Sequence, residues 1–115
     1  MRVLVDASFP TSVDHVPNSA GVEIDRVSGE ETDQDLVIRA ADEGYAAVVV
    51  MGSEMVARSS LPDLAAAKGV VLVCSVTEDP FDAESNLRQS LSTFHEHIFK
   101  AAGSVVWLRK DGLRS

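Results

Sequence analysis

The feature that most constrains the fold of this chain is a series of short, continuous apolar runs. The clearest runs lie at residues 3–5, 46–51, 70–74 and 105–108, and a weaker one lies at 22–27. Valine is the commonest residue in them, and polar residues do not alternate with apolar ones within the clearest runs. Continuous runs of this kind are typical of strands that helices cover on both faces.

The segments between these runs carry signals for helix starts and ends. Thr32 is followed three residues later by an acid, which is the spacing of a capping box, and Gly44 suits a left-handed C-terminal cap. Ser60 repeats the capping-box spacing and predicts a shorter helix. Residues 79–80 (Asp-Pro) predict a loop. Apolar residues on one helical face then predict the longest helix, over about 82–102.

Strands that alternate with helices indicate parallel pairing through right-handed crossovers. A length of 115 residues matches one domain with one core. We therefore predict a single α/β domain over 1–115, with three layers and a central, mostly parallel sheet of about five strands. Ligands of such folds bind at the carboxyl ends of the strands. Those ends include Asp6 and 52–54, and the helix start at 32–35 joins them if the chain folds back to the same edge.

The charge of the chain excludes a general nucleic-acid coat protein. The chain has 18 acids and 10 bases, for a formal charge of −8, which repels phosphate backbones unless metal ions or a local basic patch intervene. An acidic chain suits a metal-binding cleft or a basic protein partner equally well. Arg109, Lys110 and Arg114 form a basic C-terminal cluster, which is either a phosphate patch or a solvated tail.

Neither a membrane nor a secreted location is expected from the sequence. No apolar run approaches the roughly 18 residues of a membrane span, and the start of the chain is too short for the apolar part of a secretory signal. The single cysteine, Cys74, excludes an internal disulfide, lies in an apolar run as a core residue would, and is compatible with a reducing compartment. We predict a cytoplasmic protein.

Asp6 is the strongest candidate for a functional residue. A carboxylate at the end of a buried strand is costly to keep charged unless a metal ion or backbone amides compensate. The structural alternative is that Asp6 caps the following turn through amides near Ser8. Asp33 and Asp35 have a stronger structural alternative as helix-capping acids, although helix entry also directs Asp33 outward. Residues 95–97 (His-Glu-His) place two histidines on different sides of a helix, which disfavours a shared metal ion.

These motifs resemble those of PIN-like domains, in particular the compact toxin-type families. Residues 6–10 (Asp-Ala-Ser-Phe-Pro) are similar to the family's Asp-Glu-x-Leu-Pro, without the Glu. A helix that opens at Asp33, and Glu-Gly before the strand at 46–50, are further similarities. The family's next strand ends in Thr-x-Asp, whereas residues 50–52 (Val-Met-Gly) lack that carboxylate. Glu54 is the acid that could approach the same point.

The resemblance implies a metal-dependent endoribonuclease, in one form the toxin of a toxin–antitoxin pair. Asp6, Asp33 and Glu54 would be the catalytic residues and would hold Mg²⁺ or Mn²⁺, and the partners would be RNA and an antitoxin protein or a second copy of the chain. The alternative is a catalytically impaired PIN-like module that binds a protein partner or itself. Its contact surface would include Phe81, or the outer face of the long helix around Phe94 and Phe99.

Overall fold

The computed structural model describes residues 1–10, 12–13, 21–27, 29, 31–52, 59–94, 96, 98 and 105–114. Six strands form one sheet in the order β2-β1-β3-β4-β5-β6. Their bounds are β1 Arg2–Val5, β2 Glu23–Arg26, β3 Ala47–Met51, β4 Val71–Ser75, β5 Val105–Arg109 and β6 Gly112–Arg114. Neighbouring strands from β2 to β5 are parallel, and β6 is antiparallel to β5.

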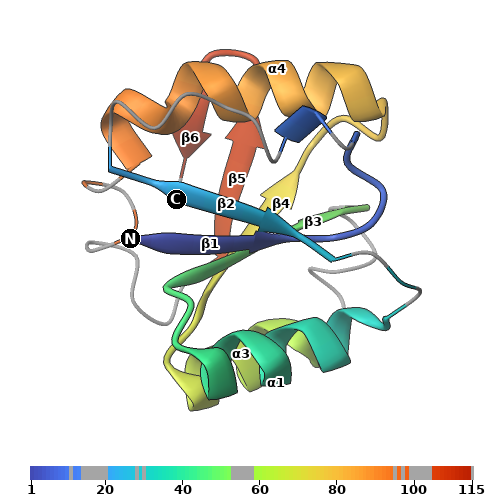
Figure 1. Cartoon of the computed structure of the whole chain (residues 1–115), viewed down its shortest axis with the longest axis vertical. Coiled ribbons are helices and arrows are strands. Elements are labelled where there is room, and N and C mark those ends of the chain that lie inside the picture. Colours follow the sequence, from blue (N-terminus) through green and yellow to red (C-terminus); the bar gives the residue numbers. More distant parts are fainter. Residues whose placement is uncertain are drawn as a thin grey trace.

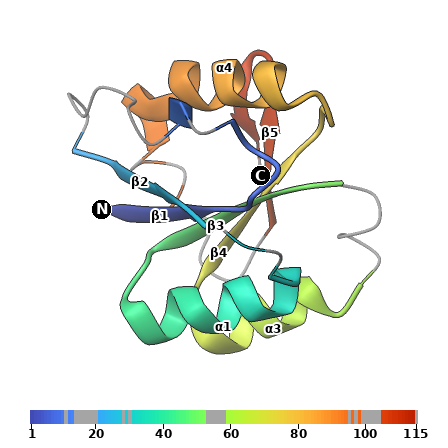
Figure 2. The ribbon, with the colours of Figure 1, turned by 45° about the vertical axis from the view of Figure 1, so that its right-hand side comes forward.

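Helices cover both faces of this sheet (Figures 1 and 2). Helices α1 (Asp33–Glu43) and α3 (Leu61–Lys68) lie on one face, and α4 (Pro80–Ser90), with the 3-10 turn η2 (Leu91–Thr93), lies on the other. The described residues thus form a three-layer α/β domain with a mostly parallel sheet, as the alternation of apolar runs and helix signals predicts.

The core is divided in two by the sheet, which explains the continuous apolar runs. Val3 and Val5 pack in the cluster that includes Leu87 of α4, whereas Leu4 packs in the cluster that includes Leu36 of α1. Successive side chains of a strand point to opposite faces. Because both faces are covered, every position from Val3 to Val5 is nearly inaccessible to solvent.

The helix starts follow the predicted caps in one case and not in another. The Thr32 hydroxyl accepts a hydrogen bond from the Asp35 amide at 3.1 Å, and Gly44 ends α1 with a φ of 79°. At α3 the predicted cap is wrong, because the side chain of Ser60 makes no capping bond. The hydroxyl of Ser59 accepts from the Leu61 amide instead, at 3.1 Å.

The helix predicted to be the longest, α4, starts earlier than predicted and has the same 11 residues as α1. It begins at Pro80 because the Asp79 carboxylate accepts from the amides of Phe81 and Asp82, at 2.9 and 3.0 Å. Asp-Pro at 79–80 is therefore a helix start and not a loop. The α-helix gives way to a 3-10 turn after Ser90, whose hydroxyl donates to the Leu87 carbonyl at 2.8 Å. After this turn, residue 94 and the described residues 96 and 98 are helical again, as predicted.

Two further predictions about the surface and the C-terminus need correction. Phe94 is fully buried in the cluster under α4, so the prediction of an exposed contact residue there is wrong. The sheet has six strands and not about five, because the chain turns at Asp111 and returns as β6. Leu113 of β6 is 2% exposed and packs in the same cluster as Phe94, and its burial holds the strand.

The topology also defines an edge where ligands are expected. From β1 the sheet continues through β2 on one side and through β3 on the other. In open parallel sheets, the crevice outside the carboxyl ends at such a reversal is the usual binding site. Here it lies where β1 ends before Asp6 and β3 ends at Met51. No helix in the described part of the chain is long and apolar enough to cross a membrane.

Candidate functional site

Asp6 lies at the carboxyl end of β1 and connects two strands. The residue is 9% exposed. Its Oδ1 accepts a hydrogen bond from the Ser8 amide at 2.9 Å, and its Oδ2 accepts from the Met51 amide at 3.2 Å. The first bond is the turn cap that the structural alternative predicts. The second ties the end of β1 to the end of β3, so the two amides together fix the orientation of the carboxylate and offset part of its desolvation.

Arg26 holds the turn that follows Asp6. The guanidinium donates from Nε to the Phe9 carbonyl at 2.6 Å and from Nη2 to the Ala7 carbonyl at 2.7 Å. Arg26 is the last residue of β2 and is paired with Val5, so the neighbouring strand supplies the clamp. Sequence reasoning missed Arg26, because a strand that ends in arginine does not show which distant carbonyls the side chain reaches.

Asp33 meets Asp6 at this edge of the sheet. Since β2 runs parallel to β1, the chain leaves β2 at the carboxyl edge and begins α1 there, as the predicted return to this edge requires. The side chain is partly buried. Burial raises the pKa of Asp33 above its ordinary value of 3.8, and the negative charge of Asp6 raises it further. The two carboxylates are thus close enough to repel each other.

A pocket of about 310 Å³ lies between the two aspartates. Its lining comes from the turn after β1 and from the lead-in to α1, and consists of Asp6, Ala7, Ser8, Gly29, Glu31 and Asp33. Glu31 adds a third carboxylate that sequence reasoning did not select, although it belongs to the acid-rich stretch before α1. Arg39 binds Glu31 at 2.6 Å, so the charge of Glu31 is already compensated.

Of the other candidates, those that the structure describes do not line this pocket. Asp35 is exposed and does not line it. Glu54, His95, His97 and Phe99 lie outside the described residues. Cys74 is a buried core residue, and burial, followed by the charge of Asp33, raises the pKa of its thiol to about 12. Because only a thiolate is an effective nucleophile or metal ligand, Cys74 remains inert at neutral pH.

The donor set suits a hydrated magnesium or manganese ion and not a fully caged one. Among the described residues, no three His, Cys, Asp or Glu side chains are placed to hold one ion. Mg²⁺ in proteins is commonly bound by one or two carboxylates and keeps several waters. Asp6 and Asp33 supply that number, and their mutual repulsion is the condition that a cation relieves.

We compared the chain with models of known protein families, with curated proteins and with solved structures, and found no match. The PIN-like resemblance therefore depends on the residues quoted above, and the activity that it implies stays a prediction.

Proposed function

We propose that the chain is a metal-dependent endoribonuclease of PIN-like type that acts in the cytoplasm. The observation that carries this proposal is the meeting of Asp6 and Asp33 at one pocket, at the carboxyl edge where the strand order reverses. The two residues are distant in the sequence, and the parallel pairing of β2 with β1 brings them to the same edge of the sheet. The toxin half of a toxin–antitoxin pair is one biological form of this activity.

The chemistry follows from what each side chain offers. Bound at this pocket, Mg²⁺ or Mn²⁺ supplies Lewis-acid chemistry, polarising a phosphoryl oxygen and lowering the pKa of a bound water. Asp6 is held in one orientation by the amides of Ser8 and Met51. Each of its oxygens has a second lone pair available. Asp33 contributes a carboxylate whose ionisation a nearby cation favours. Glu54 is the candidate for a third ligand or a general base.

The test is cleavage of a mixed, structured RNA pool by purified protein. We expect cleavage with Mn²⁺, none with EDTA, and none with Asp6→Asn, which keeps the shape of the side chain and removes its charge. Asp42→Asn is the matched control, because Asp42 is exposed near the far end of α1. Undiminished cleavage by folded Asp6→Asn protein would refute the proposal.

A second candidate function is a protein-binding module, favoured by the exposure of Phe81. This side chain, in the first turn of α4, is 75% exposed, far more than the other large apolar residues on the described surface. A partner protein or a second copy of the chain would cover it. Light scattering after size exclusion, together with Phe81→Ser, tests self-association. A strictly monomeric protein that captures no partner argues against this function.

A further inference from the structure

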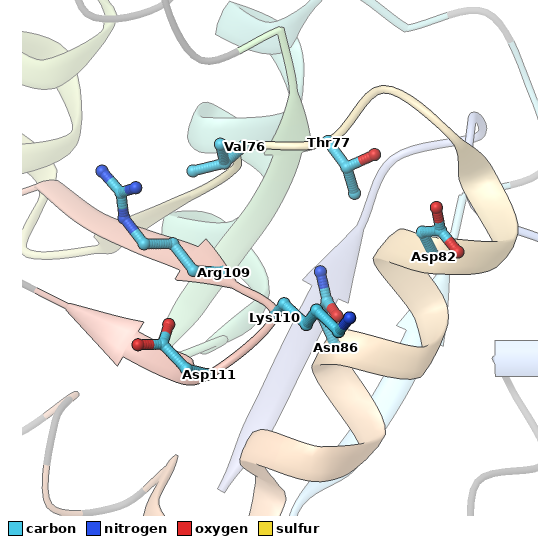
Figure 3. Close-up of a pocket in the computed structure, with 7 residues that line it drawn as sticks. All are labelled: Val76, Thr77, Asp82, Asn86, Arg109, Lys110 and Asp111. Carbon is cyan, nitrogen blue, oxygen red and sulfur yellow. The ribbon is translucent and has the colours of Figure 1, made fainter.

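A second pocket lies at the same edge of the sheet, beyond β4 and β5 (Figure 3). Its volume is about 860 Å³. Residues after β4, on α4, at the end of β5 and in the turn before β6 line it, among them Val76, Thr77, Asp82, Asn86, Arg109 and Lys110. Because β1, β3, β4 and β5 are all parallel, this pocket opens at the edge where Asp6 and Asp33 lie.

Asn86 is the most informative residue of this pocket. It is 8% exposed, and its side-chain amide makes no hydrogen bond with any described residue. No side-chain nitrogen or oxygen among the described residues is both buried and unbonded, so the amide atoms of Asn86 are accessible from the pocket. Figure 3 shows the side chain extending from α4 into the pocket that it lines. The amide therefore offers an unused donor and an unused acceptor to a ligand.

The pocket also contains two cations, Arg109 and Lys110, beside two acids, Asp82 and Asp111. Arg109 and Lys110 make no hydrogen bond or ion pair with another described residue. Asp111, the nearest acid along the chain, is bound by Arg114 at 2.8 Å. The other described arginines all have partners, so Arg109 is an exception. Because Asp111 is already paired with Arg114, Arg109 and Lys110 are the cations available to a phosphate, and Asp82 is the opposing acid of the pocket.

The remaining wall suits the flat face of a heterocycle. Val76 lines the pocket with an apolar side chain that is 42% exposed. Its amide donates to the Leu108 carbonyl at 3.0 Å, which fixes the residue beside β5. The Thr77 hydroxyl accepts from the Asp79 amide at 3.2 Å and keeps its own proton to donate. The apolar wall and the Asn86 amide, which can both donate and accept, match the base of a nucleotide. Arg109 and Lys110 match its phosphate.

We propose that this pocket binds one nucleotide of a single-stranded RNA, with the base against Asn86 and the phosphate against Arg109 and Lys110. The choice of RNA as the ligand rests on the proposed function. In the sheet order, β5 is the third strand from β1, and a spacing of about 4.8 Å between strands puts their ends roughly 14 Å apart. A short stretch of RNA spans that distance, so the pocket would position the strand for cleavage at Asp6 and Asp33.

The test is binding of fluorescein-labelled RNA oligonucleotides of single base composition to the full chain in EDTA, measured by anisotropy over a range of salt concentrations. Lys110→Gln should weaken binding about ten-fold and reduce the slope of log affinity against log salt by about 0.7. Lys68→Gln is the matched control, because Lys68 ends α3 at the opposite edge and carries the same charge. Its affinity and slope should equal those of the wild type.

Asn86→Leu separates the base contact from the phosphate contact. It should weaken binding about ten-fold, reduce the preference among bases and leave the salt slope unchanged. Equal effects of Lys110→Gln and Lys68→Gln, or wild-type affinity in Asn86→Leu, would overturn the proposal. Competition by a nucleoside monophosphate as tight as the oligonucleotide would also overturn it, since the ligand would then be a free nucleotide.

The two proposals fail in different ways. RNA binding that depends on Lys110 and Asn86, without cleavage under any metal condition, would support this pocket and refute the nuclease. Cleavage with Mn²⁺ whose KM is the same for the wild type and Lys110→Gln would support the nuclease and refute this pocket.

Discussion

Replacing Asp6 by alanine should destabilise the fold before any ligand is considered. The change leaves the amides of Ser8 and Met51 without their acceptors. A buried amide that loses its acceptor costs about 1–3 kcal/mol, so the pair costs roughly 2–6 kcal/mol. Removal of the charge also relieves its repulsion of Asp33, which places the expectation in the lower half of that range. This is a large fraction of the roughly 5–15 kcal/mol that stabilises a typical domain.

Urea denaturation followed by circular dichroism, in EDTA, measures this free energy. Asp6→Asn keeps one acceptor oxygen and should lose about half as much, roughly 1–3 kcal/mol. Asp42→Ala, at an exposed helix position, should stay within about 0.5 kcal/mol of the wild type. If Asp6→Ala also stayed within about 0.5 kcal/mol, the two amide bonds would not hold the ends of β1 and β3 together.

Three further predictions concern the site and the corrected elements. Folding raises the pKa of Asp33, so the folded protein loses stability as the pH rises from the ordinary pKa of 3.8 through the raised pKa. Asp33→Asn should therefore have a higher Tm than the wild type at pH 7 and no advantage below pH 3.8. Parallel curves of Tm against pH for the two proteins would contradict this. Asp79→Ala should cost about 0.5–2 kcal/mol in urea denaturation, whereas Ser60→Ala should cost almost nothing because its hydroxyl does not cap a helix. Leu113→Ala should cost about 2–5 kcal/mol, and a loss close to zero would show that β6 does not belong to the core.

The predictable parts of this fold are those that depend on neighbours in the sequence. Thr32 and Gly44 mark the ends of α1 correctly, because a cap joins residues a few positions apart. The strands could be recognised from the apolar runs, because a strand that is buried on both faces consists almost entirely of apolar residues. The burial of Leu113 could not be predicted from its neighbours in the sequence, because it depends on a turn that brings the residue back beside β5.

The candidate site could be predicted as a pair of residues but not as a geometry. Asp6 was selected because a carboxylate after a buried run is unusual. Its meeting with Asp33 requires β2 to run parallel to β1, which the sequence allows but does not require. Arg26 was missed because its role depends on carbonyls that are distant in the sequence. Asn86 was missed because its role depends on the pocket that its side chain lines. A polar residue on a helix face has the same pattern whether it lines a pocket or meets solvent.

The two outermost strands limit how the protein can assemble. At one border of the sheet lies β2, which has four residues and alternates exposed Glu23 and Asp25 with one buried isoleucine. At the other lies β6, with three residues ending in an exposed arginine. Short, charged borders resist the addition of a further strand from another molecule. Copies of this chain are therefore poorly suited to join into a shared sheet or a fibril, which leaves helix surfaces such as the one around Phe81 for self-association.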